Sequence, residues 1–132
     1  MDVTLAVLAD AANRTDNGKL NILGIFSTLY ASQTPCHHPI MSLVLSFQAS
    51  AFERGSQQQV GIKLVDADGQ TVLAPPDSLL QVPSADGELT PGLNLIANLT
   101  NVKFDSFGSY QFEISVNGQR AAQIPLAVIR AS

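Results

Sequence analysis

The fold is decided by the stretch Gly108-Ser-Tyr-Gln-Phe-Glu-Ile-Ser-Val-Asn-Gly-Gln-Arg-Ala-Ala-Gln-Ile-Pro-Leu-Ala-Val-Ile-Arg130. Its first half alternates polar residues with the apolar residues Tyr110, Phe112, Ile114 and Val116. This period of two predicts a β-strand with one buried face. Asn117-Gly118 tolerates the positive φ angles of a type I′ turn, and the alternation resumes at Ile124, Leu126 and Val128. The stretch therefore predicts an antiparallel hairpin in which Phe112 and Ile114 are fully buried.

Similar patterns mark strand candidates along the rest of the chain, at residues 3–12, 19–31, 41–48, 60–64, 70–73, 79–82 and 93–100. Residues 3–12 and 19–31 are expected to form an opening hairpin, in which Gly24 predicts a bulge or a close backbone approach. No segment has a convincing helical period. About eight strands separated by Gly and Pro turns predict an all-β, single-domain antiparallel β-sandwich over residues 1–132. Without Trp or a Cys pair, it is Ig-like in architecture only.

The composition excludes several classes of protein. Only 14% of the 132 residues are charged, the net charge is −4, and no basic cluster occurs, which argues against nucleic acid and anionic membranes as partners. The single cysteine excludes a disulfide-stapled secreted scaffold. No apolar run approaches the ~18 residues of a spanning helix. Because Asp2 stands where a signal peptide needs positive charge, residues 3–12 are interpreted as a strand and the protein as cytoplasmic.

Three segments together resemble a known family. They are Val3 to Phe26 with its Asp16-Asn-Gly turn, Leu64-Val-Asp-Ala-Asp-Gly69, and Gly108 to Arg130 with its Asn-Gly and Ile-Pro-Leu motifs. The chain resembles the DUF6941 type, a bacterial domain of unknown function, over nearly its whole length. The resemblance implies a stand-alone bacterial β domain and carries over no catalytic residue.

Two segments contain residue types that can bind metal ions. Cys36-His37-His38 is the only cluster of soft ligands, but consecutive residues of an extended chain point in opposite directions and no second ligand pair exists. A polar loop between Pro35 and Pro39 is the expected structure. Asp66-Ala-Asp-Gly69, with Asp10 or Asp16 helping, resembles part of a calcium site, yet Gln70-Thr-Val follows and favours a hairpin turn. No metal and no cofactor is expected.

No catalytic motif is evident, because the chain has no Gly-x-Ser-x-Gly, no phosphate-binding glycine loop and no His-Glu-x-x-His. The first hypothesis is therefore a non-enzymatic structural, assembly or protein-interaction module. The second is a small-ligand or carbohydrate-binding module, for which Phe52 and Phe107 are the aromatic residues outside the predicted core faces. The third is a hydrolase with an unrecognised site.

Several outward-facing strand positions are apolar. Leu8, Leu23, Ile25, Leu29 and Ile129 are the interface candidates, since each alternates with residues assigned to the core. A loop over residues 83–92 could cover part of this surface. Exposed apolar patches usually mark an interface, and two-fold dimers are the commonest closed assembly. A homo-oligomer is expected, a dimer first, with a different protein as the other possible partner.

Overall fold

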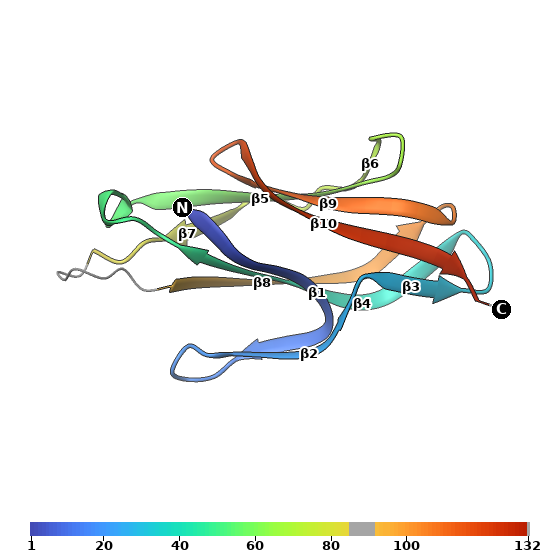
Figure 1. Ribbon diagram of the computed structural model, residues 1–132, viewed down its shortest axis with the longest axis horizontal. Coiled ribbons are helices and arrows are strands. Elements are labelled where there is room, and N and C mark those ends of the chain that lie inside the picture. The colour runs from blue at the N-terminus through green and yellow to red at the C-terminus, as the bar shows by residue number, and fades with distance from the viewer. Residues whose placement is uncertain (85–91, 132) are drawn as a thin grey trace.

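Two β-sheets pack face to face in the computed structural model, which describes residues 1–84 and 92–131 (Figure 1). The strand order of the first sheet is β2 (Leu20–Phe26), β1 (Asp2–Arg14), β4 (Cys36–Gln48) and β8 (Gly92–Phe104). The order of the second is β3 (Thr28–Ala31), β10 (Gln119–Arg130), β9 (Gly108–Val116), β5 (Gln57–Val65) and β6 (Thr71–Leu73); β7 (Ser78–Gln81) also pairs with β5. A short 3-10 turn, Ala51–Glu53, precedes β5. The predicted Ig-like sandwich is confirmed.

The β9–β10 hairpin forms as its sequence predicts. Val116 pairs with Gln119, so the loop has two residues, and Asn117 and Gly118 have φ angles of 51° and 81°. Positive φ at both positions is the signature of a type I′ turn. Phe112 and Ile114 are completely buried and pack against core residues of both sheets.

The interior is one continuous apolar cluster between the sheets. Alternate residues of β4, β5, β9 and β10 supply most of it, because each of these strands turns one face inward. Its fully buried members include Met41, Leu43, Leu45, Phe47, Val60, Leu64, Phe104, Phe112, Ile114 and Leu126.

The segment predicted as one strand, residues 19–31, is two strands in different sheets. β2 ends at Phe26, the chain crosses at Ser27, and β3 then pairs in parallel with β10. The crossing breaks the period of two. Leu29 consequently packs against the core, whereas the neighbouring Tyr30 is 70% exposed. The prediction that Leu29 faces outward is therefore wrong, and β3 and β10 form a parallel pair.

Leu8 was also assigned to the wrong face. The pairing of β1 with β4 shifts between Val3 and Leu5, which is the sign of a β-bulge. The bulge reverses the alternation, so Val3, Ala6 and Leu8 all contact the core, and Leu8 is only 1% exposed. Leu8 therefore cannot be an exposed interface residue.

The β1–β2 hairpin folds under the outer face of the four-stranded sheet. β1 leaves β4 after Ala9, and in Figure 1 the rest of the hairpin runs back beneath β4 and β8. At its tip, Arg14 Nη1 donates to the Asn94 carbonyl of β8 at 3.5 Å, and Asn94 Nδ2 donates to the Gly18 carbonyl at 3.2 Å. This cover explains why Val44, on the face of β4 opposite the core, is completely buried.

Candidate functional site

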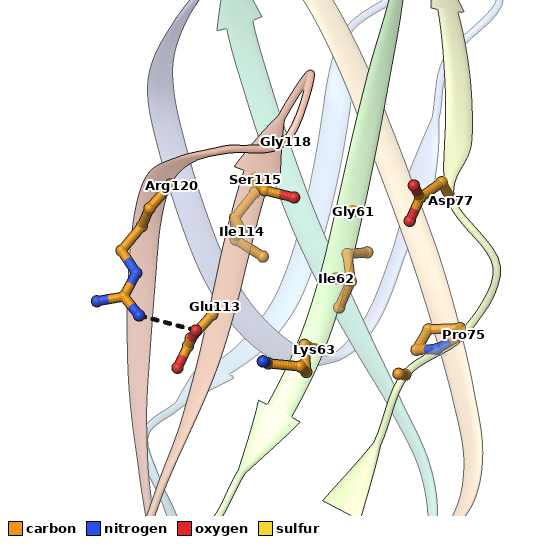
Figure 2. A pocket seen from close by; sticks show the side chains of 11 residues that line it. Gly61, Ile62, Lys63, Pro75, Asp77, Glu113, Ile114, Ser115, Gly118 and Arg120 are labelled. Atoms are coloured by element: carbon orange, nitrogen blue, oxygen red, sulfur yellow. Dashed lines mark hydrogen bonds and ion pairs between the residues drawn. The ribbon is translucent and has the colours of Figure 1, made fainter. Parts of the chain in front are cut away.

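A polar groove lies on the outer face of the six-stranded sheet, where the edge of β5 is interrupted (Figure 2). β7 pairs with Gln57–Val60 and β6 pairs with β5 again only from Leu64. Between them, residues 74–77 bend away from β5. The resulting groove has a volume of about 420 Å³.

Pro75 and Pro76 account for the interruption. Proline has no N–H to donate to a ladder, so neither residue can complete a strand beside β5. The backbone of Gln59 exchanges hydrogen bonds with Asn117 on the β9 side, accepting from its N–H at 2.8 Å and donating to its side-chain oxygen at 2.9 Å. Because the direction of backbone groups alternates along a strand, the N–H and C=O of Ile62 point the other way, toward residues 74–77. Within the described chain, no hydrogen bond joins them to that segment.

Gly61 forms a notch in the floor of the groove. A Cβ at this position would lie 2.6 Å from Ser115 Oγ and 3.1 Å from Asp77 Oδ1. These two oxygens therefore converge above the glycine, as their side chains do in Figure 2. Asp77 is held in place by Gln59, whose Nε2 donates to Asp77 Oδ2 at 2.6 Å. The hydroxyl of Ser115 and the carboxylate of Asp77 thus lie side by side in the groove.

The other half of the groove carries most of its positive charge. Arg120 Nη2 donates to Glu113 Oε2 at 2.9 Å, and Lys63 is paired in register with Glu113. Two cations around one carboxylate leave this half net positive. The half at Asp77 is net negative, so the groove is dipolar along β5.

A second, apolar groove of about 250 Å³ lies where the bend of β1, the end of β2 and the middle of β10 meet. Its lining consists of Ala6, Val7, Leu8, Ile25, Phe26, Ser27, Ile124 and Pro125. Beside it, Leu23 and Ile25 of β2 are 71% and 61% exposed. The bent hairpin thus places large exposed apolar side chains next to an apolar depression.

The prediction that Cys36-His37-His38 lies in a loop is wrong, because this segment is the start of β4. It pairs with Phe104, Lys103 and Val102 of β8, because the strand continues through Pro39. Cys36 packs against the core, His37 is exposed, and the His38 ring lies 6.1 Å from that of Phe26. Across residues 1–84 and 92–131, no group of three or more His, Cys, Asp or Glu residues could hold a metal ion.

Asp66-Ala-Asp-Gly69 is the hairpin turn between β5 and β6 that its sequence favours. Asp66 Oδ1 accepts hydrogen bonds from the N–H groups of Asp68 and Gln70, both at 2.9 Å. Gly69 supplies the positive φ angle of 81°. The Asp66 carboxylate therefore stabilises the turn itself.

The remaining candidates have different surroundings. Phe52 is fully exposed on the 3-10 turn, whereas Phe107 packs against the core and lies beneath the Arg130 guanidinium at 4.9 Å. Ile129 is exposed, and Tyr30 lies beside it in register on β3. The alternation of residues 19–31 gives no sign of the strand crossing at Ser27. It therefore does not predict that Tyr30 is exposed. The expected loop cover, residues 83–92, lies mostly outside the described residues.

Ser115 faces Asp77, but no histidine is among the described residues that line the groove.

In the part of the chain that the structure describes, no helix has the length and apolar character needed to cross a bilayer.

The fold has a counterpart among solved structures. The chain matches a solved structure of the Pseudomonas fluorescens alkylpurine DNA glycosylase AlkC bound to DNA containing an abasic site analog, with 9% identity and a TM-score of 0.54. That match covers 98% of this chain but only 30% of the glycosylase, so the chain spans less than a third of that protein's length. An immunoglobulin-like protein from Pseudomonas aeruginosa matches over 92% of this chain and 90% of its own, with 6% identity and a TM-score of 0.43.

The sequence comparisons add a family but no characterised relative. No curated protein matches the chain in sequence. The family model described as a family of unknown function, DUF6941, matches residues 4–129, which is nearly the whole chain. The chain therefore belongs to the DUF6941 family.

Proposed function

We propose that this protein is a non-enzymatic interaction module that associates first with a second copy of itself. The observation that carries the proposal is the exposed pair Leu23 and Ile25 beside the apolar groove at Ile124 and Pro125. Apolar side chains of this size on a soluble surface mark contact sites when they gather around a depression. No charged side chain is among the described residues that line the groove.

The geometry favours a two-fold arrangement. In an isologous contact the same surface occurs on both sides, so a protruding side chain needs a depression within the same patch. Ile25 and the groove satisfy this condition, because Ile25 stands at the rim of the depression that its partner copy would fill. Each copy can insert Ile25 into the groove of the other. Both depressions are then filled by a single symmetric contact.

The edge of β2 makes open-ended strand pairing less favourable than a closed dimer. Gly24 has a φ angle of 71°, and its Cα lies so close to Asp10 that a Cβ would be 2.4 Å from Asp10 Oδ2. A carboxylate beside a residue that leaves the regular strand conformation disfavours the pairing of another strand at this sheet edge. The interface is therefore expected to use the side chains of β2 and the groove.

The test is multi-angle light scattering at micromolar concentration on the wild type and on Ile25→Lys, Leu23→Lys and Ile129→Lys. We expect a dimeric mass for the wild type, a monomeric mass for Ile25→Lys and Leu23→Lys, and no change for Ile129→Lys, which lies on the other sheet. A monomeric wild type contradicts self-association. A dimer that only Ile129→Lys dissociates places the contact at Tyr30 and Ile129 and contradicts the β2 surface.

A further inference from the structure

We propose that the polar groove beside β5 binds a short, extended peptide with free ends. Its ammonium group lies at the Asp77 end and its carboxylate at the Lys63 end. This site is on the six-stranded sheet, away from the β2 surface, and the proposal does not depend on self-association.

The backbone of Ile62 supplies the first part of the argument. Its N–H and C=O point toward residues 74–77, where Pro75 and Pro76 bring no N–H. A donor and an acceptor on one residue of a strand can pair with one C=O and one N–H of an extended peptide, as in β-augmentation. The ligand class with the matching pair of groups is therefore an amide backbone in extended conformation.

The length of the interruption limits the size of the ligand. β7 pairs with β5 up to Val60, and β6 pairs with it again from Leu64, so three positions, Gly61 to Lys63, lack a strand partner on this edge of the described chain. Three residues of extended chain span roughly 10 Å. This room fits a dipeptide or tripeptide, whereas a longer strand would meet β6 or β7.

The charge pattern determines the orientation of the ligand. Asp77 Oδ1 and Ser115 Oγ converge on the notch at Gly61, which gives an ammonium group two oxygen acceptors. Asp77 is already oriented by the hydrogen bond from Gln59, so little ordering is needed on binding. At the other end, Lys63 can donate to a carboxylate, while Arg120 balances Glu113. A zwitterionic peptide matches both ends of the groove.

Gly61 makes room for the two oxygens that would bind the ammonium group. The notch exists because this residue has no side chain, and any Cβ would meet Ser115 Oγ at 2.6 Å. The groove has a volume of about 420 Å³, which suits a tripeptide with small side chains. Trialanine is the matching probe.

The experiment titrates ¹⁵N-labelled protein with trialanine and follows amide chemical shifts up to about 10 mM ligand, the range in which so small a ligand is expected to bind. Saturable shifts at Ile62, Lys63 and Ser115 are expected. N-acetyl-trialanine and trialanine amide should each bind about fivefold more weakly, and the doubly capped peptide weaker still. Absence of a saturable shift at these residues overturns the proposal. Equal binding of the doubly capped peptide also overturns it, since the termini would then play no part.

Variants test the assigned contacts. Asp77→Asn should weaken trialanine about fivefold yet bind N-acetyl-trialanine as the wild type does, and Lys63→Gln should show the same pattern with trialanine amide. Asp68→Asn and Lys103→Gln remove like charges outside the groove and should bind as the wild type does. Gly61→Ala should abolish binding if it folds. Wild-type affinity in both Asp77→Asn and Lys63→Gln contradicts the proposed orientation.

Discussion

The Tyr110 hydroxyl donates a hydrogen bond to the Ser106 carbonyl at 2.7 Å, tying the start of β9 to the turn that precedes it. The Ser106 N–H points back at the same oxygen at 3.4 Å, and the Tyr110 ring meets Phe104 edge-on at 5.0 Å. A tyrosine that bonds the backbone a few residues upstream at the start of this strand is the tyrosine corner of immunoglobulin-like sandwiches. The corner fixes the path of the chain from β8 in one sheet to β9 in the other.

Tyr110→Phe removes this hydrogen bond and keeps the ring. We expect the free energy of unfolding to fall by about 1–2 kcal/mol, since the Ser106 carbonyl loses a partner in a partly buried site. Urea denaturation measures the change. Tyr30→Phe, at an exposed tyrosine, is the matched control and should stay within about 0.5 kcal/mol of the wild type. Equal stability of both variants would show that the corner contributes nothing.

Phe112→Ala tests the inward face of the central hairpin. Phe112 is completely buried within the core cluster, and removing such a ring costs about 3–5 kcal/mol. This is a large share of the ~5–15 kcal/mol that stabilises a typical domain, so little soluble protein is expected. Gln111→Ala, one position along on the opposite face, should express and melt like the wild type. Soluble yield and thermal melting separate the two cases.

Periodicity predicted the strands whose inward face is continuous. In β9 and β10 every expected inward residue from Tyr110 to Ile114 and from Ile124 to Val128 is buried, because a regular strand keeps its phase. The prediction failed where the alternation of inward and outward residues shifts by one position. The bulge after Val3 moved Leu8 inside, and the sheet crossing at Ser27 exchanged Leu29 and Tyr30. A bulge and a crossing are decided by long-range packing, which a local pattern does not contain.

The polar groove could be predicted only in part. The strand candidate at residues 70–73 ends where β6 ends, at Leu73, but the interruption at Pro75 and Pro76 becomes a groove only because β7 rejoins the same edge of β5. Ser115 and Glu113 are among the polar residues that alternate with the apolar residues of β9. Their meeting with Asp77 and Gly61, from three separate segments, depends on the strand order.

Asn117 has two roles that substitutions can separate. It occupies the turn at a φ angle of 51°, and its side chain accepts from the Gln59 N–H at 2.9 Å and donates to Gln58 Oε1 at 2.8 Å. Asn117→Gly keeps the positive φ and loses only the side-chain bonds, so about 1 kcal/mol should be lost. Asn117→Ala also loses the side-chain bonds, and its Cβ strains the backbone at positive φ. It should therefore cost about 1–2 kcal/mol more than Asn117→Gly. Chemical denaturation gives both values. Equal losses for the two variants would mean that the turn conformation is not strained by alanine.

The two hairpin glycines Gly24 and Gly18 form a matched pair. Both have positive φ, but a Cβ at Gly24 would lie 2.4 Å from Asp10 Oδ2, whereas at Gly18 nothing lies within 4 Å. Gly18→Ala should cost only the backbone strain, about 1–2 kcal/mol. Gly24→Ala adds the collision and should open the hairpin, exposing the buried outer face at Val44. Hydrogen exchange should then rise across β2 and the second half of β1, while β9 stays protected. Unchanged exchange in β2 would show that Asp10 moves aside.

Glu53 should make stability depend on pH. Its carboxylate accepts a hydrogen bond from the Met1 terminal amine at 2.8 Å and another from the Ser50 N–H at 2.8 Å, and these contacts, the amine first, lower the pKa of Glu53. A lowered pKa means that the ionised form stabilises the folded state. This stabilisation is fully present above the unfolded pKa of about 4.3 and is lost as the pH falls through the lower folded value.

Glu53→Gln should therefore lower the free energy of unfolding by roughly 1–2 kcal/mol at pH 7, and the difference from the wild type should shrink below about pH 4. Urea denaturation from pH 7 to pH 3 measures it. Asp16→Asn, at an exposed turn carboxylate, is the control and should lie near the wild type at pH 7. Acetylation of the Met1 amine removes the charge that Glu53 contacts, so the effect of Glu53→Gln should be smaller in the acetylated chain. A Glu53→Gln effect that persists undiminished at pH 3 would mean that packing of the side chain, and not its charge, stabilises this end of the sandwich.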